Sequence, residues 1–328
     1  MGFLFLRNCH FRYSEYQNLL FKFLVLIFFL YLQQNQSIMS PLKPILFLFA
    51  LSVFSCSNET YDESDDPDIE ETDPDPDPDP INYTPTTLGD YWIYDVESTS
   101  ADTPAMNFTG TDSLYIATST ANDFTYQVNN GMDALGTMNT LLVNGSLSKT
   151  ATTLKYTGTL ELPIDIPITQ MPAINDLTIF DLDASDGEIL SDMSDSFSEI
   201  IDIQGTMVPI EISYALSTTK EDFYPTTYVN GMTYTNVYEA VLKLNISVTG
   251  TVMIFGTSQT INVIQPQDVL TVRYSYGGDI GLLRAETTQG FQLSPEVILL
   301  IQQLGATGTV TTASTTTSTE ELSSYLLN

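Results

Sequence analysis

The sequence predicts a mainly β protein built from antiparallel strands. Residues 81–328 are rich in Thr, Tyr and Ile, and apolar residues alternate with polar ones along several runs. Such alternation is typical of a strand that buries one face and exposes the other. Asn-Gly and Gly-Gly pairs lie between these runs, as expected of tight hairpin turns. A curved sheet or half-barrel and a β-sandwich both fit this strand spacing.

Three runs show the alternation most clearly, and each predicts a half-buried strand. In Val208–Leu216 the even-numbered residues are apolar, whereas Glu211 and Ser213 fall on the opposite face. Leu242–Val248 and Leu270–Tyr276 repeat the pattern. Because each run has one polar face, we expect an antiparallel sheet with one face in solvent.

Asn-Gly and Gly-Gly pairs predict the turns. Asn144-Gly145 predicts a two-residue type I′ turn between strands at Thr140–Val143 and Ser146–Lys149. Asn230-Gly231 and Gly277-Gly278 predict similar turns.

One short helix is expected near the C-terminus. Ser294 is a typical capping residue, Pro295 suits the first helical position, and Gly305 is a stop signal. The following residues are β-prone, and Glu320–Leu327 is expected to be a closing strand or a short terminal helix. Three Pro residues make 163–172 an irregular or edge segment, because Pro cannot donate to a β ladder.

The charge of the chain excludes one class of partner. The 328 residues include 10 Lys and Arg against 41 Asp and Glu, a formal net charge of -31. Binding to nucleic acid needs clustered Lys and Arg that neutralise phosphates. We therefore expect no nucleic-acid partner.

The N-terminal region predicts export and lipid anchoring. Met39–Lys43 carries one positive charge, and Ile45–Phe54 is an apolar run too short to span a bilayer. The run ends in Val53-Phe54-Ser55-Cys56, which resembles the lipobox of exported lipoproteins of the Bacteroidota type. The resemblance implies that residues 39–55 are a signal peptide removed before Cys56. It also implies that acyl chains on Cys56 bind the membrane.

Residues 1–38 precede this signal. Their apolar run, Leu19–Leu32, contains Lys22 and falls short of the ~20 apolar residues that a transmembrane helix needs. We expect residues 1–38 to be an overcalled translation start or an extra hydrophobic segment.

An acidic stretch rich in Asp-Pro pairs, residues 56–80, precedes the single β-rich domain expected at 81–328. It has almost nothing apolar to bury, so we expect a disordered tether. Ser64, Asp65 and Asp66 in this stretch resemble the export signal that directs Bacteroidota lipoproteins to the outer cell face. The expected location is the outer membrane, lipid-anchored, at the cell surface rather than the periplasmic face.

Cleavage before Cys56 removes the sole His, His10, and the second Cys, Cys9. Without them, Ser-His-Asp and Cys-His catalysis and His/Cys metal sites are excluded. We therefore expect no cofactor and no enzymatic activity. A hydrolase that uses paired carboxylates is the alternative.

Two blocks of sequence resemble a known group. Gly89–Val96 looks like the opening strand, and Arg273–Glu286 like the closing region, of uncharacterised exported Bacteroidota proteins. Those proteins are similar to the lipoprotein-carrier half-barrel group, whose curved antiparallel sheet wraps an apolar groove. The resemblance favours a half-barrel over a sandwich.

Two sets of residues are candidates for ligand binding. Tyr91, Trp92 and Tyr94 are candidates to line a sugar- or lipid-binding face, with membership of the core as the alternative. Arg273 and Arg284 flank the Gly277-Gly278 turn. They are candidates to receive an anionic ligand, or else to form ion pairs with acids such as Asp279 or Glu286.

The best metal candidate is the acidic turn that contains Asp181, Asp183 and Asp186. An EF-hand loop from Asp181 would need Gly at its sixth position and Glu at its twelfth. Asp186 and Asp192 stand there instead. A solvated turn without metal is therefore expected, and a calcium site is the weak alternative.

These observations favour a non-catalytic binding or structural module of the cell envelope, with an apolar or glycan ligand. A carrier for lipid or another hydrophobic ligand is the second hypothesis. A glycan-active enzyme is the third.

Overall fold

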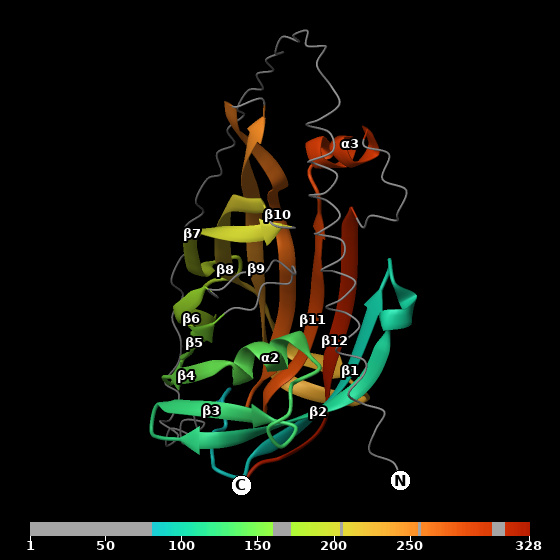
Figure 1. Ribbon diagram of the computed structural model, residues 1–328. Helices are drawn as coiled ribbons and strands as arrows, with labels where there is room; N and C mark the ends of the chain where they lie inside the picture. The colour runs from blue at the N-terminus through green and yellow to red at the C-terminus, as the bar shows by residue number, and fades with distance from the viewer. Residues whose placement is uncertain (1–80, 160–171, 204–205, 255–256, 304–311) are drawn as a thin grey trace, which may run out of the picture. The chain divides into compact units, whose positions relative to one another are not determined.

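The computed structural model describes residues 81–159, 172–203, 206–254, 257–303 and 312–328 (Figure 1). Of these residues, 71% lie in strands and 7% in helices, which confirms the mainly β prediction. The lipobox, Cys56, the acidic stretch and residues 163–171 of the Pro-containing segment lie outside the described residues.

Strands make up one antiparallel sheet, and their bounds, with those of three short helices, are as follows: β1 Tyr91–Ser100, η1 Pro104–Met106, β2 Phe108–Ser119, β3 Asp123–Val128, α2 Thr137–Val143, β4 Gly145–Lys149, β5 Thr153–Thr159, β6 Ala173–Asp181, β7 Ile189–Ile203, β8 Thr206–Val229, β9 Met232–Ile254, β10 Thr257–Gly277, β11 Gly281–Gln292, α3 Pro295–Gln303 and β12 Ala313–Leu326. The described strands lie in the order β6-β5-β4-β3-β2-β1-β12-β11-β10-β9-β8-β7. The first and last strands, β1 and β12, pair in the middle of the sheet.

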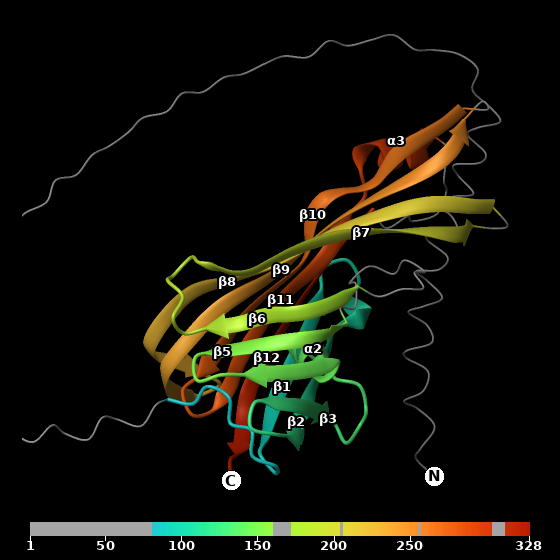
Figure 2. The same ribbon diagram turned by 90° about the vertical axis from the view of Figure 1, so that its left-hand side faces the viewer.

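This order forces the sheet to curl. β6 and β7 are consecutive in the chain but lie at opposite edges, joined by residues 182–188. A flat sheet of twelve strands would separate its edges by about 50 Å, at about 4.8 Å per strand. A connection of this length reaches about 30 Å at most. The sheet therefore curves until its edges approach, giving the predicted half-barrel (Figure 2).

Side-chain hydroxyl groups hold the β6 edge against the inner face of the opposite strands. The Thr218 hydroxyl donates to the carbonyl oxygen of Thr178 at 2.7 Å, and the Tyr274 hydroxyl donates to that of Ile179 at 2.6 Å. The Thr178 N–H in turn donates to the hydroxyl of Ser191 at 2.9 Å. Side chains of β7, β8 and β10 thus satisfy these three main-chain groups of β6 without a further ladder.

The inner face of the sheet is apolar, as the alternation predicts. In β8, Val208, Ile210, Ile212 and Leu216 are buried, whereas Glu211 is exposed on the outer face. The even-numbered apolar residues of β9 from Leu242 to Val248 are also buried. Hydrogen bonding joins all the described strands into one sheet, so the β-sandwich alternative is wrong.

One predicted hairpin is a helix instead. Thr137–Val143 forms α2, and Asn144 is its C-terminal cap, so the turn predicted at Asn144-Gly145 is wrong. Met138 and Leu142 lie on one side of the helix and are fully buried. The helix itself lies in front of the sheet in Figure 1. Contacts distant in sequence, described below, hold this helix.

The other turns follow the prediction more closely. Asn230 and Gly231 have φ of 44° and 83° and connect Val229 to Met232, as a type I′ turn requires. At Gly277-Gly278 the prediction is wrong in detail, because Gly277 pairs with Gly281 and the loop has three residues.

The predicted helix start and the closing strand are confirmed, whereas the predicted stop at Gly305 lies outside the described residues. α3 begins after Ser294, whose hydroxyl oxygen accepts the Val297 N–H at 3.3 Å and donates to Asn262 O at 2.6 Å. Ala313–Leu326 is a strand, so Glu320–Leu327 belongs to a closing strand and not to a terminal helix. No helix within the described residues has the length and apolar character needed to cross a membrane.

Candidate functional site

The aromatic residues of β1 lie in the core. Trp92 and Tyr94 are each 1% exposed. The Trp92 indole N–H donates to Ile280 O at 2.7 Å, and the Tyr94 hydroxyl donates to Leu282 O at 2.9 Å. Burial raises the pKa of Tyr94 well above its ordinary value. A binding platform made of these two rings is therefore wrong, and they join β1 to the start of β11 instead.

Tyr91 is separate from that pair. It is 37% exposed and pairs with Leu326 of β12. Because neighbouring residues of a strand point to opposite faces, Tyr91 does not share a surface with Trp92. The structure therefore does not bring the three aromatic candidates together.

Both candidate arginines form ion pairs on the outer face. The guanidinium of Arg273 lies 2.9 Å from a carboxylate oxygen of Glu221 and 2.8 Å from one of Glu239. The hydrogen bond to Glu239 is the main cause of a raised pKa of Arg273. Arg284 pairs with Glu286, as the ion-pair interpretation expects, and lies 3.2 Å from Glu321.

These ion pairs form a charged belt across five strands, β8 to β12. Arg273 and Glu286 are cross-strand partners, so the two arginine clusters adjoin. Four carboxylates surround two guanidinium groups. The belt thus has an excess of negative charge, and it does not favour an anionic ligand.

The acidic turn at Asp181–Glu188 is held by a lysine. Lys220 is 7% exposed, and its ammonium donates to Ala184 O at 2.6 Å and lies 3.4 Å from Asp186. The same ammonium lies 5.5 Å from the centre of the Tyr238 ring. Asp181 accepts the Asp183 N–H at 3.0 Å, which closes the turn.

No three His, Cys, Asp or Glu side chains of the described residues are grouped to hold a metal ion. The structure thus does not gather Asp181, Asp183 and Asp186 into such a group. The Lys220 ammonium lies beside Asp186 and supplies a positive charge to this turn. Lys220 continues the even-numbered, inward-facing row of β8. A lysine in this otherwise apolar row is the sequence signal that could have identified its role.

Two fully buried carboxylates bind the start of α2. Asp112 of β2 accepts the N–H groups of Leu135 and Gly136, at 2.9 and 2.8 Å. Glu320 of β12 accepts those of Met138 and Asn139, at 2.7 and 3.0 Å. Both carboxylates are 0% exposed.

Burial raises the pKa of Glu320 to about 7, although its backbone hydrogen bonds act in the opposite direction. The Asp112 carboxylate is a further, smaller cause of the increase. All these bonds satisfy N–H groups that have no partner within the helix at its start. We therefore assign the Asp112 and Glu320 carboxylates a role in stabilising the fold.

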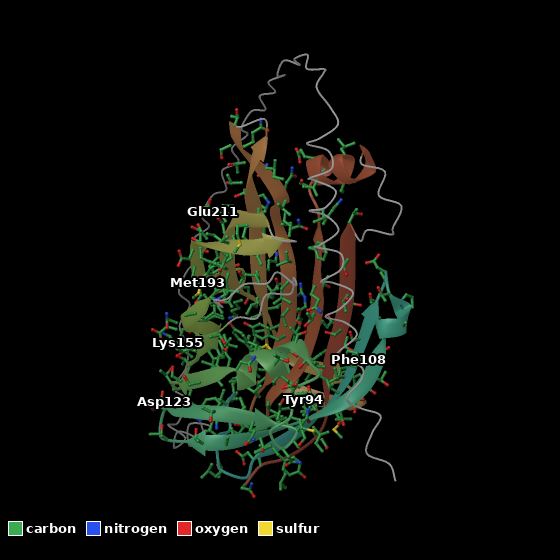
Figure 3. All side chains as sticks on the ribbon, viewed as in Figure 1. Tyr94, Phe108, Asp123, Lys155, Met193 and Glu211 are labelled. Atoms are coloured by element: carbon green, nitrogen blue, oxygen red, sulfur yellow. The ribbon has the colours of Figure 1, made fainter. Side chains whose placement is uncertain are left out.

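One hollow, here called the polar hollow, has a volume of about 570 Å³ and lies at β3–β6. Polar residues alone line it: Asn122, Asp123, Ser148, Lys149, Thr150, Thr153, Lys155, Asp176, Thr178 and Asp181. Figure 3 labels Asp123 and Lys155 at this side of the sheet.

The two lysines of the polar hollow differ in their contacts. Lys149 is engaged, because its ammonium donates to Thr84 O at 2.8 Å and to the Thr86 hydroxyl at 2.7 Å. Burial lowers the pKa of Lys149, against the effect of the nearby Asp90 carboxylate. Lys155 forms no ion pair with a described residue. Its ammonium is therefore available to a ligand.

A second hollow, here called the serine hollow, has a volume of about 420 Å³. It lies on β7–β9 and is lined by Ser194, Asp195, Ser196, Ser213, Tyr214, Ala215, Asn245 and Ser247. Asp195 is the only charged residue of this lining.

Comparisons with protein-family models, with curated proteins and with solved structures find no match to the chain.

Proposed function

We propose that the protein is a non-catalytic binding module of the cell envelope, anchored to the outer membrane at the cell surface by acyl chains on Cys56. Its ligand is a hydroxyl-rich molecule of the glycan class, bound in the polar hollow. The observation that carries this proposal is the lining of the polar hollow, which combines side chains that donate hydrogen bonds with side chains that accept them.

The chemistry of the lining supports a ligand with many hydroxyl groups. Carboxylates such as Asp123 and Asp176 accept hydrogen bonds, and the Lys155 ammonium donates them. A hydroxyl group does both, so a glycan can use each kind of partner. An apolar ligand would leave these groups without partners, which costs free energy.

The distribution of basic residues also supports this site. Residues 81–328 contain six Lys and Arg, and two of them line the polar hollow. Lys220, Arg273 and Arg284 are already engaged in ion pairs. Lys243 lies on the exposed outer face of β9, away from the hollow.

Calorimetric titration of the protein with a panel of oligosaccharides tests the proposal. Lys155→Ala and Asp176→Asn are each expected to weaken binding of a glycan ligand by about tenfold or more, because each removes a charge-assisted hydrogen bond. Lys243→Ala is the matched control and should bind as the parent protein does. Equal affinity of all three variants would overturn the site, and no binding to any oligosaccharide would overturn the ligand class.

A carrier for apolar ligands is the second candidate. Met193 and Phe197 of β7 project from the inner row of the sheet and are only half-buried. A ligand that covers them would gain from burial of apolar surface. Native mass spectrometry distinguishes the candidates, since a carrier is expected to retain lipid during purification.

The membrane anchor is tested separately. Cys56→Ala is expected to move the protein from the membrane fraction to the soluble fraction, because two acyl signals are needed for stable attachment. Unchanged fractionation would contradict anchoring at Cys56.

A further inference from the structure

The polar hollow contains a row of side chains that crosses four strands. Asp123 of β3 is the cross-strand partner of Ser148 of β4. Ser148 is in turn the partner of Lys155 of β5, and Lys155 is the partner of Thr178 of β6. Direct partners lie on the same face of a sheet, so these side chains form one line. At about 4.8 Å between neighbouring strands, the line is about 14 Å long. A ligand that uses all of it must lie across the strands and must be longer than one sugar ring.

The row faces away from the apolar core. Phe124, Leu147 and Leu177 are chain neighbours of row residues, and all three are buried in the core. Successive side chains of a strand point to opposite faces, so the row occupies the other face. Asp123 is exposed and Lys155 is half-buried. A ligand can therefore reach both charged groups without displacing core residues.

Three charged side chains of the polar hollow are free within the described part of the chain. Lys155 forms no ion pair there, as stated above, and neither ion pairs nor side-chain hydrogen bonds join Asp123 or Asp176 to a described residue. The other two charged groups of the lining are engaged. Lys149 donates to the segment before β1, and Asp181 closes the acidic turn. Free carboxylates therefore outnumber the free ammonium by two to one.

This excess favours a ligand that carries a positive charge. The chain as a whole has a formal net charge of -31, so its field also attracts cations. The Lys155 ammonium repels a ligand cation, and that repulsion falls with distance. Asp176 stands on the strand next to Lys155, whereas Asp123 is two strands away, about 10 Å. Asp123 is therefore the better partner for a ligand ammonium, and Lys155 is left to donate to hydroxyl oxygens.

We infer that the polar hollow binds an oligosaccharide of amino sugars, which lies across β3–β6. One sugar ammonium pairs with the Asp123 carboxylate, and the Lys155 ammonium donates to hydroxyl oxygens of another ring. Ser148 and Thr178 exchange hydrogen bonds with further hydroxyl groups along the row. This inference rests on the glycan site proposed above and names the kind of sugar that the site selects.

Three probes test the inference by calorimetric titration of the full chain, at low salt and at a mildly acid pH that keeps sugar amines protonated. They are the tetramer of glucosamine, the tetramer of N-acetylglucosamine, which has the same chain without the charges, and the glucosamine monomer. An exposed ion pair is weak, so the glucosamine tetramer is expected to bind about threefold to fivefold more tightly than the acetylated tetramer. The monomer cannot span the row and is expected to bind at least about tenfold more weakly than the glucosamine tetramer.

Variants assign the two roles to separate residues. Asp123→Asn is expected to weaken the glucosamine tetramer by about threefold to fivefold and to leave the acetylated tetramer unchanged. Because Asp123 is exposed, Asn at this position should not disturb the fold. Lys155→Ala is expected to weaken both tetramers alike, since both carry hydroxyl groups. Glu211→Gln, on the exposed face of β8 and well apart from Asp123 in Figure 3, is the matched control for the loss of one negative charge.

The possible results separate this inference from the proposed function. Equal binding of the two tetramers, both weakened by Lys155→Ala, would overturn the amino-sugar class and leave the glycan site standing. Equal effects of Asp123→Asn and Glu211→Gln would show attraction to the negative chain as a whole and overturn the role of Asp123. Tetramer binding that Lys155→Ala does not change would overturn the polar hollow itself. If neither tetramer binds, the amino-sugar class is wrong. Loss that is confined to Asp123→Asn and the glucosamine tetramer supports the inference.

Discussion

Replacing Glu320 by Gln is expected to change how the stability of the protein depends on pH. The pKa of Glu320 is raised to about 7 in the folded protein, compared with 4.5 for an ordinary Glu. The folded state therefore holds one proton more than the unfolded state between these two values. Stability from this group is fully present below about pH 4.5 and is lost as the pH rises through about 7.

The magnitude follows from the shift. A difference of one pKa unit corresponds to about 1.4 kcal/mol, so a rise from 4.5 to about 7 corresponds to about 3 kcal/mol. Gln cannot ionise, so Glu320→Gln should remove this loss. Its amide N–H₂ faces backbone N–H groups that now lack an acceptor, which lowers stability by about 1–3 kcal/mol at every pH. The free energy of unfolding of the variant should therefore be lower at acid pH and should approach or exceed the parent value near pH 8.

Urea unfolding measures this effect, because the single Trp of the chain, Trp92, is buried and reports unfolding by its fluorescence. Midpoints and slopes are recorded from about pH 5 to about pH 8 for parent and variant. Other carboxylates affect both proteins alike, so the difference between the two curves isolates Glu320. Glu211→Gln, on the exposed face of β8, controls for the loss of one charge. A difference that stays constant over this range would refute the assignment of a raised pKa to the buried carboxylate.

Three further substitutions test single contacts. Gly136→Ala should lower stability by about 1–3 kcal/mol, because its Cβ overlaps the Glu320 carboxylate; thermal unfolding measures this. Tyr274→Phe should leave the Ile179 carbonyl without its donor, at a cost of about 1–3 kcal/mol, and should speed amide exchange in β6. Lys220→Met should loosen the acidic turn at Asp181–Glu188, so limited proteolysis should cut that turn sooner than in the parent, and unchanged cleavage would contradict the role of the ammonium.

The sheet was predictable where burial alone determines the structure. Val208–Leu216 alternates because every second side chain meets the inner core, and that information is local to the strand. The type I′ turn at Asn230-Gly231 was predictable for a similar reason, since positive φ at both residues is a local requirement. The strand order was not predictable in this way, because pairing of β1 with β12 depends on residues more than two hundred positions apart.

The helix α2 was missed because its determinants are distant. Thr140–Val143 followed by Asn144-Gly145 has the local signature of a strand and turn. Asp112 and Glu320, on β2 and β12, supply the carboxylates that satisfy the helix start. A local pattern carries no information about such partners, so tertiary contacts override it.

The candidate site was predictable only in part. The sequence offered both alternatives for Trp92 and Tyr94, and the core alternative is the one that the structure supports. Ion pairs of the two arginines with acids such as Asp279 or Glu286 were one of the two alternatives, and Arg284 does pair with Glu286. The polar hollow could not be predicted from the sequence. Its Thr, Asp and Lys residues stand at surface positions of four strands, and nothing in the sequence distinguishes them from other surface residues until the strands are assembled.

Charged residues within an apolar row of a strand are a further sequence signal, because they mark where another segment contacts the inner face of the sheet. Asp112 shares its row with Leu114 and Ile116, Glu320 shares one with Leu322, and Lys220 extends the apolar row of β8. A buried charge is costly unless hydrogen bonds or an opposite charge compensate it. Each of these residues therefore marks a place where the inner face of the sheet meets polar backbone groups of another segment. For Asp112 and Glu320 that segment is the start of α2, and for Lys220 it is the acidic turn between the two edges of the sheet. In a curved sheet with one apolar face, such positions can be read from the alternation and used to predict which row is crossed by a helix or a loop.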